Sequence, residues 1–359
     1  MTKDSRMVSF VRDLEGNGAL NEVVNFVKNS KGRELELCFR GNSQPESITV
    51  YKNNHKVWNI KKSDETHYEI EISLNHARYT SDWKYKLKNM IKENQEYSGK
   101  TCPAIQKNCC VGYFKSNKTS RIDEAFLKRT YSVINSFFSD YFDSQKNIDA
   151  FKKEKMGNSY VPTDKRILKE KIKQQELYTK ILNGSNSDYL AYDLEFVQPK
   201  LKAGSNQPDM FAIKKLKDGK FKIVLVEVKS TEGACTGSSG LVNHLKGMLE
   251  YIKTNTYIEA RKSDAINIVK TFRNLGLRGI GDDFDMFDED ISNNIFQGIE
   301  ILFVFTGEHK KGAIDYCNRI KKAKSKTYKE FKAICDTKKN CEIVIKQYTD
   351  NGEFKDLIL

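Results

Sequence analysis

The sequence contains no apolar stretch long enough to span a bilayer, although the chain has 359 residues. A transmembrane helix needs about 20 consecutive apolar residues. The first residues, MTKDSRMVSFVRDLEGNG, also lack the apolar core of a secretory signal peptide. We therefore expect a soluble, cytoplasmic protein that does not insert into a membrane.

The eight cysteines and five histidines lack the spacing of a structural metal site. Cys102, Cys109 and Cys110 cluster, but they form no CxxC pair and no histidine lies near them. The acidic stretch from Asp282 to Asp290 lacks the D-x-D-x-D-G spacing and the trailing glutamate of an EF-hand loop. We expect reduced, partly buried thiols and a solvated acidic insertion, rather than zinc, iron–sulfur or calcium sites.

Internal repeats, low-complexity tracts and coiled-coil heptads are also missing, and the length is typical of two domains. Acidic residues are the scarcer charge. Lys and Arg total 61 against 48 Asp and Glu, so the formal net charge is +13 and the pI is near 9.1. This excess favours a polyanionic partner, of which nucleic acid is the commonest and a membrane surface the alternative.

The first 155 residues predict a small α+β domain without a chemical motif. A helix over 18–28 precedes four short alternating segments typical of an antiparallel meander, namely 34–39, 47–51, 56–60 and 68–73. Two further helices are predicted over 81–93 and 123–142. Aromatic residues alternate with lysines in the meander (Tyr51, Lys52, Lys56, Trp58, Lys61, Lys62), which fits either base stacking or an ordinary lysine-rich face.

The most informative segment runs from Gln207 to Ser230, QPDMFAIKKLKDGKFKIVLVEVKS. Residues 210–215 and 221–229 predict two strands of a hairpin. The loop Lys217-Asp218-Gly219, with Gly219 in the left-handed conformation, is a common three-residue connection. Its second strand is apolar over Ile223-Val224-Leu225-Val226, as in a strand buried on both faces, and then ends in charged residues.

This loop would place Asp209 directly opposite Glu227 and on one sheet face with Lys229. A two-residue turn at Asp218-Gly219 would move Asp209 to the other face, so the site depends on the register. Two carboxylates this close repel each other unless a proton or a metal lies between them. A hard cation such as Mg²⁺ takes oxygen ligands and keeps several waters, which suits a site with few carboxylates.

The pattern Pro208-Asp209, then Glu227-Val228-Lys229, resembles the PD-(D/E)xK nuclease superfamily, which includes many restriction and repair enzymes. The resemblance covers the chain from about residue 164 onward, where the order of elements is similar to the helix–three strands–helix–strand core of that superfamily. The predicted elements are a helix over 164–183, a strand over 189–197, the hairpin, a helix over 241–252, a strand over 295–305, a helix over 311–324 and a strand over 342–347.

This resemblance implies a set of catalytic and metal-binding residues. Asp209, Glu227 and the Val228 carbonyl would hold Mg²⁺, with Mn²⁺ as an alternative, and Lys229 would position the attacking water. The helix before the first strand often supplies a further acidic residue in this superfamily, which here is Glu176, with Glu170 as the alternative. A solvated helix surface explains either glutamate equally well.

The helix after the hairpin often faces the metal site with a Gln, Lys or His near its start. The usual Gln is missing here, and Asn243, His244 and Lys246 are the available nucleic-acid contacts. His244 fits a phosphate contact, a proton carrier or a surface residue equally.

We therefore expect an α/β fold with a restriction-endonuclease-like mixed sheet flanked by helices over 156–359, preceded by the meander domain over 1–155. The expected function is metal-dependent hydrolysis of DNA, with RNA as a further candidate substrate. An inactive nucleic-acid-binding protein with a nuclease-like core and a basic scaffold protein are the alternatives. The sequence leaves open homo-oligomer formation and the biological setting, whether restriction, repair or phage defence.

Overall fold

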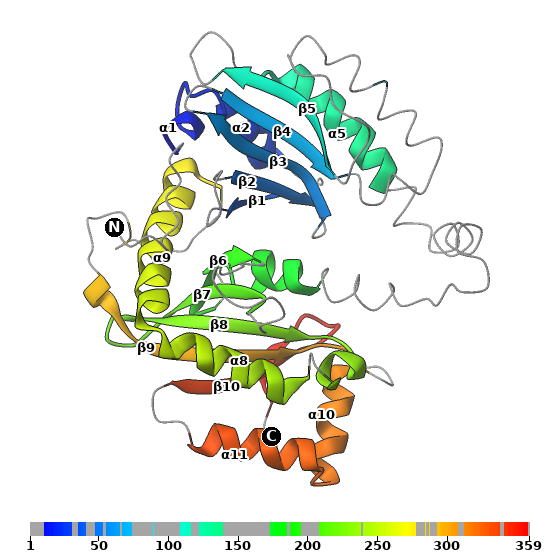
Figure 1. Ribbon diagram of the computed structural model, residues 1–359, viewed down its shortest axis with the longest axis vertical. Helices are drawn as coiled ribbons and strands as arrows, with labels where there is room; N and C mark the ends of the chain where they lie inside the picture. Colours follow the sequence, from blue (N-terminus) through cyan, green and yellow to red (C-terminus); the bar gives the residue numbers. More distant parts are fainter. Residues whose placement is uncertain are drawn as a thin grey trace, which may run out of the picture. The chain divides into compact units, whose positions relative to one another are not determined.

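The computed structural model of the chain describes residues 11–30, 35–40, 47–52, 55–64, 67–73, 89, 108–115, 122–138, 173–184, 187–194, 208–237, 240–277, 284, 287, 293–307, 312–337 and 341–357. The chain divides into two compact units, one of Val8–Asp164 and one that consists mainly of Lys165–Leu359. This division falls a few residues after the boundary predicted between residues 155 and 156. Figure 1 shows the elements of both units.

The amino-terminal unit is built on an antiparallel sheet with the strand order β1-β2-β3-β4-β5. Neighbouring strands pair in sequence order, as in a meander. The four predicted strands are confirmed, and β5 is a strand that the sequence pattern did not predict. The strands are β1 (Leu35–Arg40), β2 (Ser47–Lys52), β3 (His55–Asp64), β4 (His67–Ser73) and β5 (Asn108–Lys115).

Helices α2 (Asn21–Lys28) and α5 (Glu124–Phe138) pack on this sheet, and the one-turn helix α1 (Val11–Leu14) precedes them. The apolar side of α2 is buried because its valines and Phe26 recur at helical spacing. The helices predicted over 18–28 and 123–142 are thus confirmed. The helix predicted over 81–93 lies, apart from Asn89, outside the described residues, as do Cys102 and the side chains of Cys109 and Cys110.

Trp58 is a core residue of this unit. It is completely buried, with the rings of Phe26 and Tyr131 at 5.4 and 6.2 Å, and its Nε1 donates to Thr130 Oγ1 at 3.2 Å. Tyr51 is only 1% exposed. A ring without an accessible face cannot stack on a base. Base stacking by these two residues, one of the two interpretations of the lysine–aromatic segment, is therefore wrong.

The carboxy-terminal unit is built on a mixed six-stranded sheet with the order β11-β10-β9-β8-β7-β6. β7 is antiparallel to both of its neighbours, β6 and β8, whereas β8, β9 and β10 run parallel. The strands are β6 (Tyr189–Leu194), β7 (Met210–Lys215), β8 (Phe221–Lys229), β9 (Phe296–Phe305), β10 (Glu342–Tyr348) and β11 (Phe354–Asp356). All predicted strands of this unit are confirmed, and the short edge strand β11 is additional.

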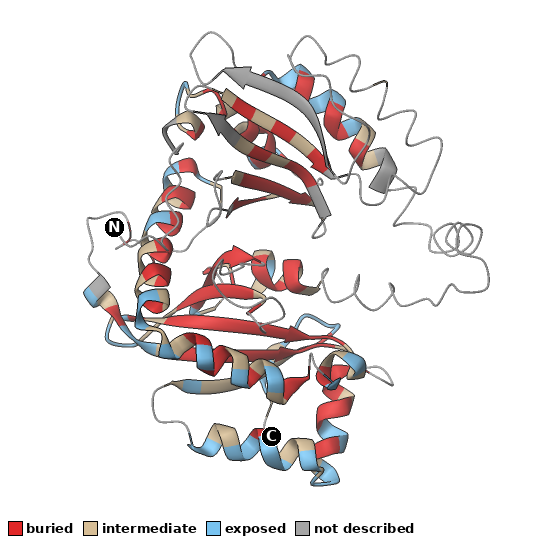
Figure 2. Ribbon diagram, in the orientation of Figure 1, coloured by how far each residue is buried: buried red, intermediate tan, exposed pale blue. Residues whose placement is uncertain are grey.

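Strand β8 is the centre of this unit. It lies between β7 and β9, and eight of its nine residues are buried, which agrees with the apolar run in its sequence. Figure 2 shows the same burial continuing into β7 and the second half of β9. Charged residues at the end of β8 are therefore held in a low-dielectric part of the molecule.

Two helices connect β8 to the parallel strand β9, because parallel neighbours need a crossover connection. They are α8 (Leu241–Lys253), which was predicted, and α9 (Asn255–Leu275), which was not. α9 packs on the sheet face that carries Phe211, where Arg261 lies over the Phe211 ring and Tyr192 donates to the Arg261 carbonyl. The sequence pattern did not predict α9 because its buried side contains charged residues, Arg261 and Asp264, which are typical of an exposed surface. In the structure they form an ion pair at 2.9 Å.

Two more helices, α10 (Ala313–Lys322) and α11 (Lys326–Thr337), form the chain connection from β9 to the parallel strand β10. α10 was predicted and α11 was not. Phe331 of α11 packs edge-on against Phe303 of β9 at 5.3 Å. Among the described residues, no helix is both long and apolar enough to cross a membrane.

The acidic segment after α9 supplies core residues. Phe284 and Phe287 are fully buried and pack on Phe221 at the start of β8, with ring centroids 5.7 and 5.0 Å away. The prediction of a solvated insertion is therefore wrong at these two positions, because aromatic burial outweighs the surrounding acidic residues.

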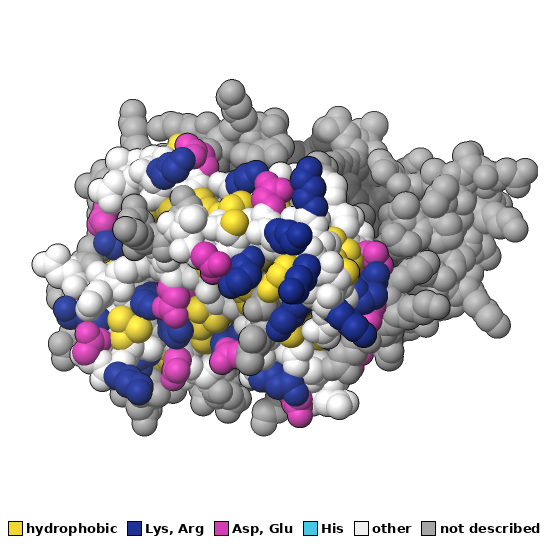
Figure 3. All heavy atoms as spheres, turned by 90° about the horizontal axis from the view of Figure 1, so that it is seen from below, with side chains coloured by type: hydrophobic (Ala, Val, Ile, Leu, Met, Phe, Trp, Pro, Cys, Tyr) yellow, Lys and Arg dark blue, Asp and Glu magenta, His cyan; other side chains and the backbone are white. Residues whose placement is uncertain are grey.

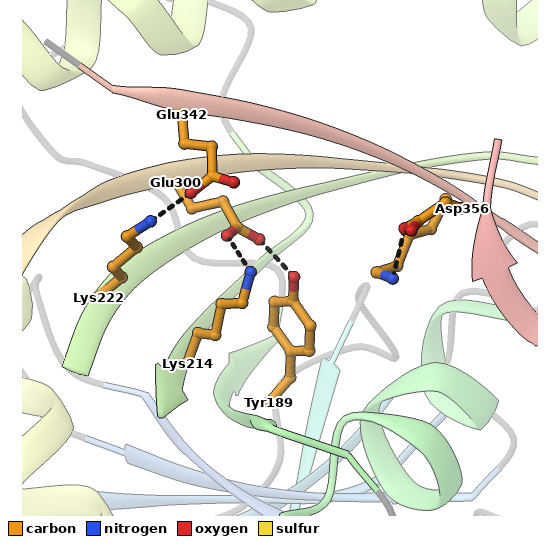
Figure 4. A network of polar contacts seen from close by, with 7 residues as sticks. Tyr189, Lys214, Lys222, Glu300, Glu342 and Asp356 are labelled. Atoms are coloured by element: carbon orange, nitrogen blue, oxygen red, sulfur yellow. Dashed lines mark hydrogen bonds and ion pairs between the residues drawn. The ribbon is translucent and has the colours of Figure 1, made fainter. Parts of the chain in front are cut away.

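The other sheet face carries a polar network around Glu300 of β9 (Figure 4). Glu300 is fully buried and accepts hydrogen bonds from Tyr189 at 2.6 Å and from Lys214 at 2.7 Å. Burial, followed by the charge of Glu300, raises the pKa of Tyr189 above its usual range. Lys222 pairs with Glu342 beside this cluster. The buried carboxylate is thus compensated by one cation and one hydroxyl.

We predict that Lys214→Met lowers the free energy of unfolding by about 3 kcal/mol, because it leaves the buried Glu300 charge without its cation. Lys346→Met is the control. Lys346 pairs at 2.7 Å with Asp356, which is 75% exposed, and such pairs contribute roughly 0–1 kcal/mol. Urea unfolding of the two variants measures the difference. Equal small losses would show that the Lys214–Glu300 pair does not carry this stability.

Candidate active site

The β7–β8 hairpin has the predicted three-residue loop. The Leu216 amide donates to the Lys220 carbonyl at 2.7 Å, which closes the loop. Gly219 has φ +80°, a left-handed conformation that glycine adopts without strain. The Asp218 carboxylate accepts from the Lys220 amide at 3.1 Å and fixes the turn further. The turn chemistry of the sequence therefore sets the register as expected.

The register brings the two predicted carboxylates to opposing positions. The last paired residues of the ladder are Met210 and Val226, and the same register continued by one position would place Asp209 opposite Glu227. Backbone bonding alternates along an antiparallel ladder. Counted from the bonded pair at the loop, Asp209 and Glu227 fall at a non-bonded position, where facing side chains are closest.

The neighbouring position explains the proline. Pro208 falls opposite Val228, where two backbone bonds would normally form, but proline has no N–H to donate to the Val228 carbonyl. The Val228 N–H donates instead to Asp209 Oδ2 at 2.8 Å. This bond holds the Asp209 carboxylate at the end of β8, and that carboxylate remains partly exposed.

Glu227 is at the centre of a buried charged cluster. Its Oε1 lies 2.6 Å from Lys229 Nζ and 2.7 Å from His244 Nδ1, the latter from the first turn of α8. The His244 and Glu227 atoms are within ion-pair distance, but they are not aligned for a hydrogen bond. Glu227 Oε2 is buried and has no hydrogen-bond partner within the described part of the chain.

The burial of this cluster is costly in free energy. Glu227 is 1% exposed and Lys229 is 3% exposed. Removing a carboxylate and an ammonium from water costs several kcal/mol per ion, and mutual attraction offsets this cost only in good geometry. An orphaned carboxylate oxygen adds a further penalty. The end of β8 is therefore an expensive arrangement without an evident structural purpose, as is common at functional sites.

The other α8 residues proposed for nucleic-acid contact point away from the cluster. Asn243 Nδ2 donates to the Gly237 carbonyl at 3.0 Å, which ties α8 to the preceding loop. Lys246 pairs with Glu330 of α11 at 2.8 Å. Of the three candidates, His244 alone is joined to the carboxylates, because the fourth residue of α8 is the one that projects toward the end of β8.

Glu176 lies elsewhere. Its carboxylate is 2.9 Å from Lys173, whose ammonium lies 5.2 Å from the Tyr348 ring. Gln347 aligns through Phe305 with Lys229, so the adjacent Tyr348 occupies the opposite sheet face. Glu176 is thus an ion-pair partner on the other face and is not brought together with Glu227. Glu170 lies outside the described residues.

The helix that carries Glu176 also differs in form from the prediction. Its last turn is the π-helical segment η4 (Leu177–Ile181), so the spacing of side chains changes there. The loop after β8 contains the short helix η5 (Glu232–Cys235), capped by Thr231 Oγ1, which accepts from the Ala234 amide. The sequence signal for this cap is a threonine two residues after the end of β8.

The donor set fits Mg²⁺ better than a transition metal. Within the described residues, no group of three or more His, Cys, Asp or Glu is arranged as a metal site. Mg²⁺ needs only one or two carboxylates, since it keeps several waters. The orphaned Glu227 Oε2, the opposing Asp209 and the Val228 carbonyl, whose ladder partner lacks an N–H, are oxygen donors of this kind.

No protein-family model, curated protein or solved structure matches this chain. A function for this chain is therefore inferred from the geometry of its own residues.

Proposed function

We propose that this chain is a metal-dependent nuclease that hydrolyses phosphodiester bonds in DNA at the end of β8. The observation that carries the proposal is the buried Glu227 carboxylate. One of its oxygens lies 2.6 Å from the Lys229 ammonium, and the other has no hydrogen-bond partner among the residues that the structure describes. A divalent cation would resolve both the missing contact and the repulsion between the two carboxylates.

Each residue has a role in this proposal. Asp209, Glu227 and the Val228 carbonyl hold Mg²⁺ or Mn²⁺. When bound, the ion supplies charge stabilisation at a phosphate oxygen and lowers the pKa of a bound water. Lys229 orients the attacking water and counters the developing negative charge from the same sheet face. The pair of Glu227 with Lys229 keeps the ammonium in place in a site from which bulk water is largely excluded.

The order of elements gives further support. A helical segment, three antiparallel strands, the α8–α9 crossover and the parallel strand β9 follow each other along the chain. This order is similar to the core of the PD-(D/E)xK superfamily. Asp209 directly precedes the second strand, and Glu227 and Lys229 lie on the third.

A second candidate is an inactive nucleic-acid-binding protein. The bond from the Val228 amide to Asp209 favours it, because a carboxylate that caps a strand end has a structural role without any metal. Under this alternative Lys229 serves only to neutralise Glu227. The net charge of +13 is compatible with both candidates.

The deciding experiment is a cleavage assay on supercoiled plasmid, linear duplex and single-stranded DNA, with RNA as a parallel substrate. We predict cleavage with Mg²⁺ or Mn²⁺ and none with EDTA, because two facing carboxylates without a cation cannot bind a phosphate productively. Binding without cleavage under every metal condition would favour the inactive protein. Cleavage that persists in EDTA would exclude the metal-dependent chemistry.

A further inference from the structure

The turn between α10 and α11 is strongly basic. From Arg319 to Lys332 the sequence has seven basic residues and a single acidic one, Glu330. Four lysines of this segment are exposed and form no ion pair with any residue that the structure describes: Lys322, Lys324, Lys326 and Lys329. Glu330 itself is paired with Lys246. Figure 3 shows the face seen from below, on which many Lys and Arg side chains are exposed among Asp and Glu side chains.

Lys324 occupies a position that normally belongs to glycine. It has φ +46°, and it is the one non-glycine residue with positive φ in the described ranges. The Ser325 amide donates to the Ile320 carbonyl and the Lys324 amide to the Lys321 carbonyl, which is the Schellman arrangement at the end of α10. A lysine there is strained, whereas glycine is not. The lysine therefore carries a local stability penalty at this position, and strained residues of this kind cluster at functional sites.

The turn is fixed on both sides. α10 ends in the Schellman bonds, and Ser325 Oγ accepts from the Tyr328 amide at the start of α11. The exposed lysines at 322, 324, 326 and 329 are consequently presented from a rigid frame. Rigid presentation lowers the entropy lost when such side chains contact a partner.

The same helix is anchored at the candidate active site. The Ala313 amide at the start of α10 donates to the Ser230 carbonyl, one residue after Lys229. Arg319 pairs with Glu232 of η5 at 2.8 Å. The ten residues of α10, Ala313–Lys322, rise by about 15 Å along the helix. The basic turn thus lies on a short, rigid path from the end of β8.

We propose that the α10–α11 turn is a docking surface for the phosphate backbone of duplex DNA. The surface consists of Lys322, Lys324, Lys326 and Lys329. Unpaired, exposed lysines on a fixed frame suit regularly spaced phosphates, which they bind without reading sequence. The choice of DNA as the bound partner rests on the proposed nuclease function. The existence of the basic surface does not depend on that function.

The first test is Lys324→Gly, whose two expected effects have opposite signs. Glycine relieves the left-handed strain, so the thermal midpoint should rise by roughly 2–4 °C. Loss of one phosphate contact should reduce the slope of log affinity against log salt by about 1. Binding is measured by fluorescence anisotropy on a labelled DNA duplex in EDTA. A stabilised variant with unchanged affinity and slope would overturn the proposal.

The second test compares two variants that each remove two charges. Lys322→Ala/Lys329→Ala should lower the salt slope by about 2, because each lost contact contributes about 0.9. The control Lys217→Ala/Lys220→Ala removes exposed lysines at the loop of the β7–β8 hairpin, at the far end of β8, and should change the slope much less. Equal effects would mean that net charge and not this surface drives binding.

These experiments test the docking surface independently of the proposed nuclease activity. Binding in EDTA does not depend on metal or on catalysis, so loss of affinity in the turn variants supports the surface even if no cleavage occurs. Cleavage by the wild-type chain with unaltered binding by the turn variants would retain the nuclease and reject the surface. An RNA duplex of the same sequence is run in parallel, and an effect confined to RNA would overturn the assignment to DNA.

Discussion

Asp209→Asn and Glu227→Gln are each expected to reduce Mg²⁺-dependent cleavage of DNA by roughly 10³-fold or more. Loss of an anionic ligand removes several kcal/mol of charge stabilisation, at about 1.36 kcal/mol per decade of rate. Asn keeps an acceptor for the Val228 amide, and Gln keeps the volume of Glu227, so the fold should persist. Single-turnover cleavage at saturating Mg²⁺ provides the measurement.

Amide replacements are chosen over alanine because Glu227 is paired with the buried Lys229 ammonium. Two facing carboxylates alone would repel, and truncating one of them would then relieve strain. The structure changes this expectation, since Glu227 already neutralises the buried Lys229. Glu227→Ala would remove the carboxylate that lies 2.6 Å from that buried ammonium and destabilise the protein by about 3 kcal/mol or more. A loss of activity in Glu227→Ala could therefore come either from destabilisation or from loss of a metal ligand. A loss of activity in Glu227→Gln with an unchanged thermal midpoint would come from the lost ligand alone.

Asp218→Asn is the matched control. Asp218 is an exposed acid on the same hairpin, and its amide analogue can still accept from the Lys220 amide. It should cleave at the wild-type rate. Wild-type cleavage by both Asp209→Asn and Glu227→Gln would remove the two carboxylates from the reaction and leave the inactive binding protein as the better account.

Lys229→Ala is expected to lower the cleavage rate by roughly two to four decades, the range for a lost acid–base or electrostatic group. DNA affinity should change far less, because one phosphate contact among many contributes little to the total. The Lys229 side chain is 3% exposed and its ammonium lies 2.6 Å from Glu227, so little of it is accessible to the backbone of a bound duplex.

Two further variants separate chemistry from folding. Lys229→Arg should rescue poorly, because guanidinium is larger, planar and never deprotonated. Lys229→Gln keeps a hydrogen-bond donor beside Glu227 and guards against a misfolded Ala variant. Lys220→Ala, at the exposed start of the same strand pair, is the control. Near wild-type turnover by folded Lys229→Ala would make β8 an ordinary buried strand and remove the main support for a nuclease.

The elements that the sequence predicted are those with a local signal. The alternating and apolar runs of β1 to β4 and β6 to β10 were found because strand periodicity is a property of neighbouring residues. The hairpin register was found because a left-handed glycine at Gly219 selects the loop. Helix α9 was missed because its core side buries Arg261 and Asp264 as a pair, which periodicity interprets as solvent-exposed.

The residues of the candidate site also fall into two groups, those placed by local spacing and those placed by tertiary packing. The sequence by itself determined that Asp209, Glu227 and Lys229 share one face at the end of a buried strand, since two-residue alternation and the turn fix this without any distant contact. Only the tertiary structure decided which helical residues join them. It brought His244 to Glu227, directed Lys246 to Glu330 and placed Glu176 on the opposite sheet face. Those outcomes depend on how α8 and the helix before β6 pack on the sheet, which is set by side chains far apart in the chain and has no counterpart in local spacing.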